Sequence, residues 1–526
     1  MTDSNRREWL QGAAAALLLS PSGAFATPSS GGEYTLFWGD LHNHNAVGYA
    51  LGSLERTYDV AREHLDFLAF TPHAQWHDMP KMPNNAHMKW VNGFRVTRER
   101  WPDVQKMAAA NNKPGEFVSF LAYEWHSSEF GDYCVYYAGD GKPLKYFDHV
   151  RELQDYARRT GTLIIPHHLA YKQGWRGANW KYLDPKLSPV LEIYSEHGLS
   201  EWDRGPHDYI RHSIGGRWTR NTLREALRRG FRTGVIASSD DHLGYPGAYG
   251  EGLVGVYAKD LSREAILEAI RARRTIAVTG DRIQLRATLN GKPMGSELPY
   301  AREREIEVAV QGADEIERID VVKNGRVIAR HFPEDHLPEN AEWPGEFLCR
   351  LEFGWGPWAA LNMERVADWD ATATIDGGRL LGLLPCFQSG PYDENRRNRV
   401  LTRSKSSCRF QLYTSRKQAF EERATNSVIL HLAGGPDAAL EVKLAKPARL
   451  TLRKSLLDLA EYNEIEFTGP FTSESFVVHR LVPPQLFRAS FKATDRGERG
   501  HTDWYYVRVV QTNGHQAWSS PFWVQG

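Results

Sequence analysis

Residues 37–44 read Phe37-Trp38-Gly39-Asp40-Leu41-His42-Asn43-His44, an apolar run that ends in two histidines. On extended backbone, side chains two residues apart point to the same face, so the imidazoles of His42 and His44 can reach one metal ion. Imidazole is the commonest metal ligand in proteins. The stretch therefore predicts a metal site just after the first strand.

Five later apolar runs end in the same kinds of residue. Each ends with His, Asp or Glu, in the segments Thr71-Pro72-His73, Ala122-Tyr123-Glu124-Trp125-His126, Ile165-Pro166-His167-His168, Glu192 with Ser195-Glu196-His197, and Ala237-Ser238-Ser239-Asp240-Asp241-His242. In α/β barrels the carboxyl ends of the strands form the active site. One histidine would indicate little, but six such strand ends in succession predict a single shared site.

The two halves of the chain differ in periodicity. Residues 33–280 contain 14 of the 20 histidines and alternate short strand-like runs with helical patterns, which predicts an α/β fold with a mostly parallel sheet or barrel. Residues 281–526 change to period-two alternation with Asn-Gly turns, which predicts an all-β, sandwich-like region of one or two modules. Within that half, residues 335–400 show no assignable pattern.

These motifs resemble the PHP family, named for polymerase and histidinol phosphatase. The resemblance covers about residues 35–245 and implies a distorted (β/α)7 barrel with two or three divalent metal ions. It implies that His42 and His44 ligate one ion, that Glu124 bridges two, that His73 and His167 ligate a second, and that Asp240 and His242 complete the shell. Imidazole mixed with carboxylate suits Zn, Mn or Fe better than Ca or Mg.

The sequence also departs from the family pattern at two places. Residues 45–53 contain neither His nor Asp, although many members place one there, and Pro72 stands where an Asp usually precedes the histidine. A centre with one or two metals therefore stays open beside the three-metal form.

Further candidates flank the predicted ligands. His126 and His197 could serve as additional ligands or as a general acid for the leaving group, or could lie outside the site. Lys172, Trp175 and Arg176 follow the fourth strand end and are predicted to bind substrate, with a solvated loop as the alternative.

The N-terminus has the features of an export signal. Residues 1–26 combine Arg6-Arg7, a short apolar run and Ala24-Phe25-Ala26, which predicts a twin-arginine signal peptide, and residues 27–32 form a linker. This predicts a periplasmic or extracellular protein. The remaining chain contains no stretch of about 18 apolar residues, so we expect no membrane span. Three of the four cysteines lie in the second half, where either a disulfide or buried thiols is compatible with the sequence.

Charge and motifs together limit the function. Lys plus Arg and Asp plus Glu both number 65, which argues against a dedicated nucleic-acid binder. We predict an exported metal-dependent hydrolase, a phosphoesterase that acts on a small phosphoester. Two alternatives stay open: a metal-dependent hydrolase or lyase that processes an extracellular glycan, and a binding protein that keeps its metal only for stability. The sequence does not indicate an oligomeric state.

Overall fold

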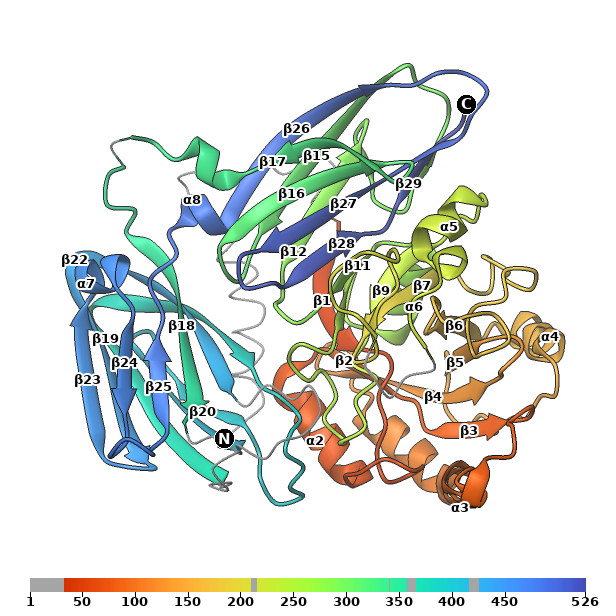
Figure 1. Cartoon of the computed structure of the whole chain (residues 1–526), viewed down its shortest axis with the longest axis horizontal. Helices are drawn as coiled ribbons and strands as arrows, with labels where there is room; N and C mark the ends of the chain where they lie inside the picture. The colour runs from red at the N-terminus through yellow and green to blue at the C-terminus, as the bar shows by residue number, and fades with distance from the viewer. Residues whose placement is uncertain (1–32, 210–214, 340, 357–365, 416–424) are drawn as a thin grey trace.

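The computed structural model describes residues 33–209, 215–339, 341–356, 366–415 and 425–526. The predicted signal peptide and linker, residues 1–32, lie outside these ranges. The described chain is a mixed α/β structure with a large β-rich portion, as Figure 1 shows. None of its helices combines the length and the apolar character needed to cross a bilayer.

The largest sheet has 14 strands and joins both ends of the described chain. Its main path runs β14-β29-β27-β28-β11-β10-β1-β2-β4-β5-β6. From the first half it takes β1 (Thr35–Asp40), β2 (Phe67–Phe70), β3 (His73–Trp76), β4 (Val118–His126), β5 (Asp132–Tyr137), β6 (Leu163–His167), β10 (Leu253–Ala258) and β11 (Thr275–Val278). From the second half it takes β14 (Glu297–Leu298), β16 (Ile316–Lys323), β17 (Arg326–His331), β27 (Asp503–Gln511), β28 (Gln516–Ser519) and β29 (Phe522–Val524).

Strand direction corrects part of the sequence prediction. Strands β1, β2 and β4 are parallel, as expected, but β5 runs antiparallel to β4 and β6, and β10 runs antiparallel to β1. Residues 127–131 are too few for the crossover that a parallel pair needs, so β4 and β5 form a hairpin. A separate sheet holds β7 (Val190–Ser195), β8 (Gly198–Leu199) and β9 (Gly234–Ala237). Hydrogen bonding among the described strands therefore does not close the predicted barrel.

Helices follow the strands of this half, as the helical patterns between the strand-like runs predict. They are α2 (Leu54–His64), α3 (Met88–Asn111), α4 (Val150–Thr160), α5 (Leu223–Arg228) and α6 (Arg263–Arg271), with short 3-10 turns at Pro83–Asn85 and Thr219–Asn221. Ser53 caps α2, because its side chain accepts a hydrogen bond from the Arg56 N–H. The sequence pattern did not identify α3, which has only a weakly segregated apolar face.

Two further sheets complete the β-rich portion. One has four strands, β12 (Gln284–Leu289), β13 (Lys292–Pro293), β15 (Glu303–Gln311) and β26 (Arg488–Arg496). The other has eight, β18 (Glu346–Trp355), β19 (Val366–Cys386), β20 (Arg399–Arg403), β21 (Ser407–Ser415), β22 (Asn426–Lys446), β23 (Leu450–Ser455), β24 (Glu464–Phe467) and β25 (Ser475–Val478). The remaining short helices are Pro333–His336, α7 (Leu456–Glu461) and α8 (Pro484–Phe487).

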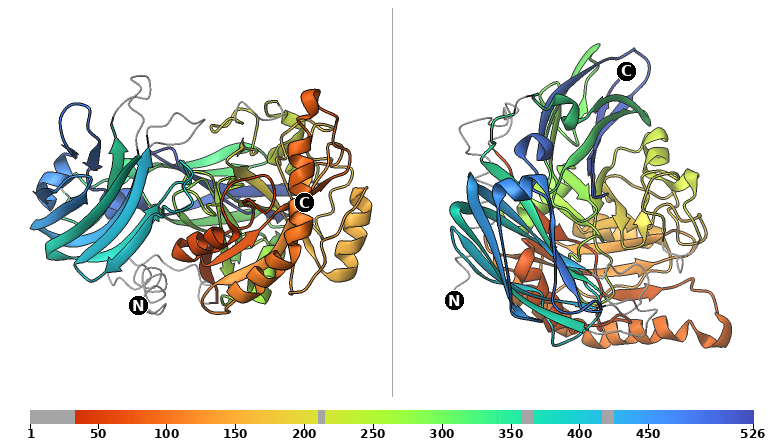
Figure 2. Two further views of the ribbon diagram at one scale, coloured as in Figure 1. Left: turned by 90° about the horizontal axis from the view of Figure 1, so that it is seen from below. Right: turned by 60° about the vertical axis from the view of Figure 1, so that its left-hand side comes forward.

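The three sheets pack in different ways. Leu285 and Val308 of the four-stranded sheet share a core with Ile319 and Val507 of the largest sheet, so these two sheets lie face to face. Figure 2 shows the eight-stranded sheet on one side of the molecule and the long helix α3 on the other. All four cysteines are buried free thiols, which settles the choice against a disulfide.

Candidate metal centre

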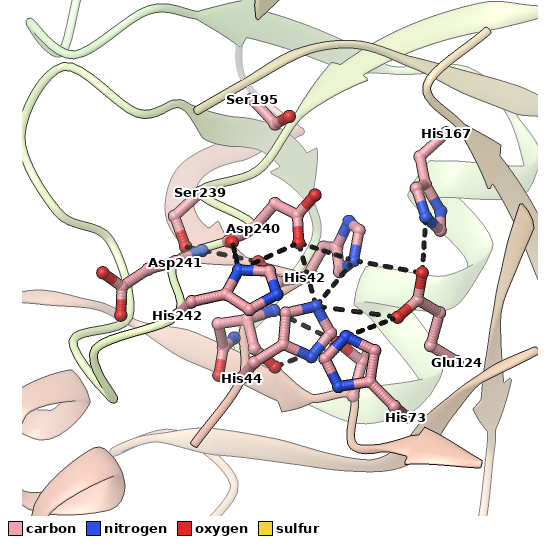
Figure 3. A network of polar contacts seen from close by, with 12 residues as sticks. His42, His44, His73, Glu124, His167, Ser195, Ser239, Asp240, Asp241 and His242 are labelled. Carbon is pink, nitrogen blue, oxygen red and sulfur yellow. Dashed lines mark hydrogen bonds and ion pairs between the residues drawn. The ribbon is translucent and has the colours of Figure 1, made fainter. Parts of the chain in front are cut away.

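The ends of the strands bring the predicted ligands together. His42 and His44 follow β1, and hydrogen bonds from Asp240 N to His42 O and from His44 N to Asp241 O tie this turn to the loop after β9. Figure 3 shows the side chains converging on one another. We call the group the histidine–carboxylate cluster; its members are His42, His44, His73, Glu124, His126, His167, Asp240 and His242.

One half of the cluster is centred on Asp240. Its Oδ1 lies 2.9 Å from His44 Nε2 and 3.2 Å from His42 Nε2, and the two Nε2 atoms are 3.2 Å apart. Asp240 has a φ of 55°, a strained conformation for a residue other than glycine. The backbone thus holds this carboxylate against both histidines of the H-x-H pair.

The other half is centred on Glu124. Its Oε1 lies 2.7 Å from His167 Nε2, and its Oε2 lies 3.3 Å from His73 Nε2 and 3.2 Å from His126 Nε2. The distances from His42 Nε2 to Oε1 and from His44 Nε2 to Oε2 are 3.9 and 3.6 Å. Glu124 therefore lies between the two halves, where a bridging ligand would lie.

The cluster is buried and incompletely hydrogen-bonded. Seven of its members are at most 1% exposed: His42, His44, His73, Glu124, His126, His167 and Asp240. Within the described residues, several buried atoms have no hydrogen-bond partner, namely His44 Nδ1, His73 Nδ1, Glu124 Oε2, His126 Nε2, His167 Nε2 and Asp240 Oδ2. Buried polar atoms are ordinarily paired, so these atoms point to a missing ligand.

The donor set fits divalent metal ions. Several groups of three or four donors have their atoms within 4.8 Å of one another, among them His42-His44-Glu124 and His73-Glu124-His126. Bonds of about 2.0–2.2 Å to a shared ion hold neighbouring ligand atoms roughly 3–3.5 Å apart, which is close to most of the separations found here. Histidines and carboxylates that approach this closely without hydrogen-bond geometry could therefore hold metal ions.

The protonation state of each cluster residue depends strongly on the charges of its neighbours. Burial raises the pKa of Glu124, but the imidazoles of His126, His167 and His73 outweigh burial and hold that pKa well below its ordinary value. Burial and the neighbouring imidazoles hold the pKa of His44 well below its ordinary value. Burial lowers the pKa of His42 and of His126, but Asp240 outweighs burial and holds the pKa of His42 well above its ordinary value, and Glu124 raises the pKa of His126 to about 9. A bound metal ion would compete with protons for these ring nitrogens.

A surrounding layer of side chains fixes the ligands. Asp40 is fully buried and accepts hydrogen bonds from Ser239 N at 3.1 Å and Gly247 N at 2.8 Å, and burial raises its pKa to about 6. Glu192 Oε2 lies 3.1 Å from His42 Nδ1 and so orients that ring. Carboxylates that hold the second nitrogen of a ligating histidine are typical of metal sites.

The other predicted residues have different surroundings. His126 is 1% exposed and its Nδ1 lies 3.5 Å from Asp132 Oδ2, whereas the His197 side chain is 14% exposed, with Nε2 3.3 Å from Asp240 Oδ2. His242 is the most open member of the cluster, with a side chain that is 27% exposed. The site therefore opens to solvent on the side of His197 and His242.

Of the three predicted substrate residues, the structure brings one to the cluster. Arg176 Nε lies 2.8 Å from Asp132 Oδ2, and its Nη2 lies 3.1 Å from His126 Nδ1. Trp175 is 59% exposed and Lys172 is also exposed. Arg176 thus already has a carboxylate partner beside the site, and the other two lie on the surface.

Sequence reasoning did not assign three residues that lie against the cluster. His168 Nε2 lies 3.2 Å from Asp240 Oδ2, Glu196 Oε1 lies 2.9 Å from His242 Nδ1, and Asp132 accepts from Arg176. The His167-His168 doublet was visible in the sequence, but alternation along a strand predicts that only one of two neighbours faces the site. The left-handed backbone at His168, with a φ of 50°, turns the second ring back toward Asp240.

Fold and site together define a class: an α/β protein with a large β-rich portion and a buried cluster that could hold metal ions. Comparison with known proteins adds a match to one family over part of the chain. Residues 50–133 and 245–291 match a family described as a protein of unknown function, DUF3604.

Two relatives and one solved structure match part of the chain. An uncharacterized protein of Chlamydia trachomatis serovar D is 31% identical over 341 residues, which cover 60% of this chain and 51% of that protein. An uncharacterized protein of Chlamydia pneumoniae is 29% identical over 191 residues, 33% of this chain and 30% of that protein. The chain thus spans about half or less of the length of these relatives. A two-domain protein from Bacteroides vulgatus, described as containing a predicted PHP-like metal-dependent phosphoesterase, aligns with a TM-score of 0.33 and 14% identity, over 55% of this chain and 80% of that chain.

Proposed function

We propose that this protein is a metal-dependent hydrolase of the PHP type, whose site at the strand ends cleaves a phosphoester. The observation that carries the proposal is the convergence of buried, unpartnered histidine and carboxylate atoms from five strand ends of the first half. In this interpretation β1 to β10, with the separate sheet of β7 to β9, form a distorted barrel around the site.

We assign at least two metal positions to the cluster. His42, His44 and Asp240 would hold one ion, and His73, His126 and His167 the other, with Glu124 bridging. The group formed by Glu196, His197, Asp240 and His242 could hold a third. A structural zinc site closes with four ligands. The larger donor set here favours a catalytic centre over the alternative of a binding protein that keeps its metal for stability.

Bound ions of this kind generate hydroxide near neutral pH and stabilise the charge on phosphoryl oxygens. The chain's own residues would do the rest. Asp40 holds the loop of Asp240 through Ser239, and Glu192 fixes the ring of His42. His197, at the open side of the site, is placed to deliver a proton to the leaving oxygen.

The test measures metal and hydrolysis in the same samples. Protein purified with Mn or Zn is assayed with p-nitrophenyl phosphate and bis(p-nitrophenyl) phosphate, and its metal content is measured. We expect His42→Ala to lower both metal content and kcat/KM, the latter by at least about a thousandfold. His501→Ala, an exposed histidine outside the cluster, is the control. Full metal content with no phosphoester turnover would favour the glycan-processing or binding alternatives.

Export is a separate part of the proposal. We propose that residues 1–26 direct the folded protein to the periplasm or the extracellular space, which rests on the paired arginines and the Ala24-Phe25-Ala26 segment. Replacing Arg6 and Arg7 by lysine should leave the protein in the cytoplasmic fraction of the producing bacterium. Unchanged export of that variant would contradict a twin-arginine signal.

A further inference from the structure

A cavity whose lining contains no predicted ligand lies between α5 and the C-terminal strands β27 and β29. Figure 1 shows these elements side by side. The volume of the cavity is about 590 Å³, within the range of small-molecule sites. Its walls come from the segment after β8, from α5, from the turn between β16 and β17, and from β27 and β29. Three tryptophans line it: Trp202, Trp504 and Trp523.

Each indole contacts a guanidinium group or another ring. The Arg224 guanidinium carbon lies 4.4 Å from the ring centre of Trp202, and that of Arg273 lies 5.0 Å from the ring centre of Trp523. The ring of Trp504 is parallel to that of Tyr506, with 2° between the planes and 6.0 Å between the centres. Aromatic rings fixed in this way lose little entropy when a ligand binds.

The cationic side chains of the cavity all have carboxylate partners. Arg224 Nη2 lies 3.0 Å from Glu201 Oε1, Arg228 Nε lies 2.7 Å from Glu225 Oε2, and Arg232 pairs with Glu297. Among the described lining residues no arginine is left to neutralise a phosphate. The charge pattern therefore disfavours a nucleotide or another anion. It suits a neutral ligand whose hydroxyls both donate to carboxylates and accept from guanidiniums.

Two indole N–H groups at the cavity are unsatisfied. Trp202 Nε1 and Trp523 Nε1 are buried and have no hydrogen-bond partner in the part of the chain that the structure describes. Trp523 is only 2% exposed, and tryptophans buried to this degree usually find an acceptor for that group. Because both nitrogen atoms are themselves buried, a ligand contacts the accessible rings and side chains of the cavity rather than these N–H groups.

We propose that this cavity binds a neutral saccharide. A pyranose ring presents C–H groups on one face, which pack on indole, and hydroxyls around its rim, which bond to paired charged groups. Trp202, which is partly exposed, provides the face, and the nearly buried Trp504 and Trp523 form the wall behind the ligand. The Arg228–Glu225 pair provides polar contacts at the mouth, where the Arg228 side chain is 73% exposed. The proposal does not depend on the hydrolase assignment, since none of these residues belongs to the histidine–carboxylate cluster.

Binding to the full-length protein can be measured by calorimetry and saturation-transfer NMR. The probes are maltohexaose and N-acetylglucosamine pentamer as neutral ligands, and a galacturonate pentamer as the acidic comparison. Trp202→Ala removes one platform, and Thr219→Trp fills the cavity from an exposed position without removing a core side chain. Trp355→Ala, a 47% exposed tryptophan of the eight-stranded sheet, is the matched control.

We expect at least one neutral probe to bind, and both cavity variants to weaken it by about tenfold or more while the control leaves it unchanged. Should Trp202→Ala fail to fold, Thr219→Trp alone carries the test, with its melting temperature as the check on folding. No neutral probe binding up to about 10 mM would overturn the proposal. Binding that Thr219→Trp leaves unaltered, or tighter binding of the galacturonate, would overturn it equally.

Discussion

Two groups of buried charged side chains differ in which partners satisfy their hydrogen-bonding atoms. The first is the histidine–carboxylate cluster. The second, the Glu201 network, joins Glu201, Arg224, Asp320, Tyr506, Arg508 and Trp518 between the first half and the C-terminal strands. Glu201 Oε1 accepts from Tyr506 OH at 2.6 Å and from Arg508 Nη1 at 3.0 Å, and Oε2 accepts from Trp518 Nε1 at 2.9 Å. Arg508 Nη2 also donates to Asp320 Oδ2 at 2.6 Å.

This difference distinguishes buried charges that stabilise the fold from buried charges that bind a ligand. Burial raises the pKa of Glu201, but the guanidiniums of Arg508 and Arg224 outweigh it and hold that pKa below its ordinary value. Both carboxylate oxygens have donors from the chain. Glu124 is equally buried, yet its Oε2 has no hydrogen-bond donor among the described residues. A buried carboxylate that the chain satisfies contributes to the fold, and one that it leaves unsatisfied indicates a ligand.

The largest expected effect comes from Asp240→Asn in the cluster. The amide keeps the shape of the side chain but removes the charge shared by His42 and His44, so metal binding should fall. We expect kcat/KM for p-nitrophenyl phosphate to drop by about a thousandfold or more, with metal content below half of the wild-type value. Phosphate release and elemental analysis measure the two quantities.

The fold should survive this change, because an amide of the same shape fills the same buried position and Asp240 Oδ2 has no hydrogen-bond partner in the described chain. The melting temperature of the metal-free variant should therefore equal or exceed that of the metal-free wild type. A variant that melts well below metal-free wild type, with its metal retained, would show that Asp240 is structural and would erase the distinction between the two groups.

Glu201→Gln should give the opposite pattern. It removes the carboxylate that Arg508 shares with Arg224, leaves Arg508 with Asp320 alone, and turns an amide N–H₂ toward a donor. The free energy of unfolding should therefore fall by about 3–5 kcal/mol. Denaturant unfolding measures the loss, and elemental analysis should find metal content unchanged. Loss of metal at an unchanged unfolding free energy would contradict the structural role.

Sequence patterns could predict the cluster better than the network, for a physical reason. Residues such as His42, His73 and Asp240 are unusual at the ends of apolar runs, so their identity and spacing indicate a purpose before any contact is known. Glu201 and Arg508 are 307 residues apart and are common surface residue types. Only the pairing of β11 with β28, which no local pattern encodes, brings the C-terminal strands against the first half.

The same limit applies to the surroundings of the ligands and to strand direction. Asp132 is the first residue of β5, opposite His167, and no sequence pattern indicates that this strand turns back as a hairpin. His168 depended on a left-handed φ, which side-chain alternation does not reveal. Residue type and period therefore predicted the α/β character and the location of the site. Hairpins and the residues that orient the ligands needed the three-dimensional structure.

Asp132→Asn tests a residue that acts through a ligand rather than as one. The change weakens the contact to His126 Nδ1 and removes the charge that pairs with Arg176, so His126 loses its fixed orientation. We expect the metal dissociation constant to rise about 10–100-fold, as for other changes behind a ligating histidine. Competition with a chromophoric chelator measures it. Asp155→Asn, in an exposed ion pair with Arg158, is the control, and equal affinities in both variants would refute the positioning role.

The smallest effect is expected at Glu346, a partly buried carboxylate that, like Glu201, has hydrogen-bond donors from the chain. Burial raises its pKa, but hydrogen bonds with His431 and Arg488 outweigh burial and lower that pKa to about 2. A carboxylate with a lowered pKa stabilises the fold above the unfolded-state value of about 4.5, and this contribution is lost as the pH falls toward 2. Because its side chain is 19% exposed, we expect only about 1–2 kcal/mol at pH 7. Melting temperatures of the wild type and Glu346→Gln should differ at pH 6 and approach each other as the pH falls from about 4.5 toward 2. A constant difference across that range would mean that packing, not ionisation, sets the contribution of Glu346. Carboxylates with hydrogen-bond donors from the chain would then not all stabilise the fold through their charge.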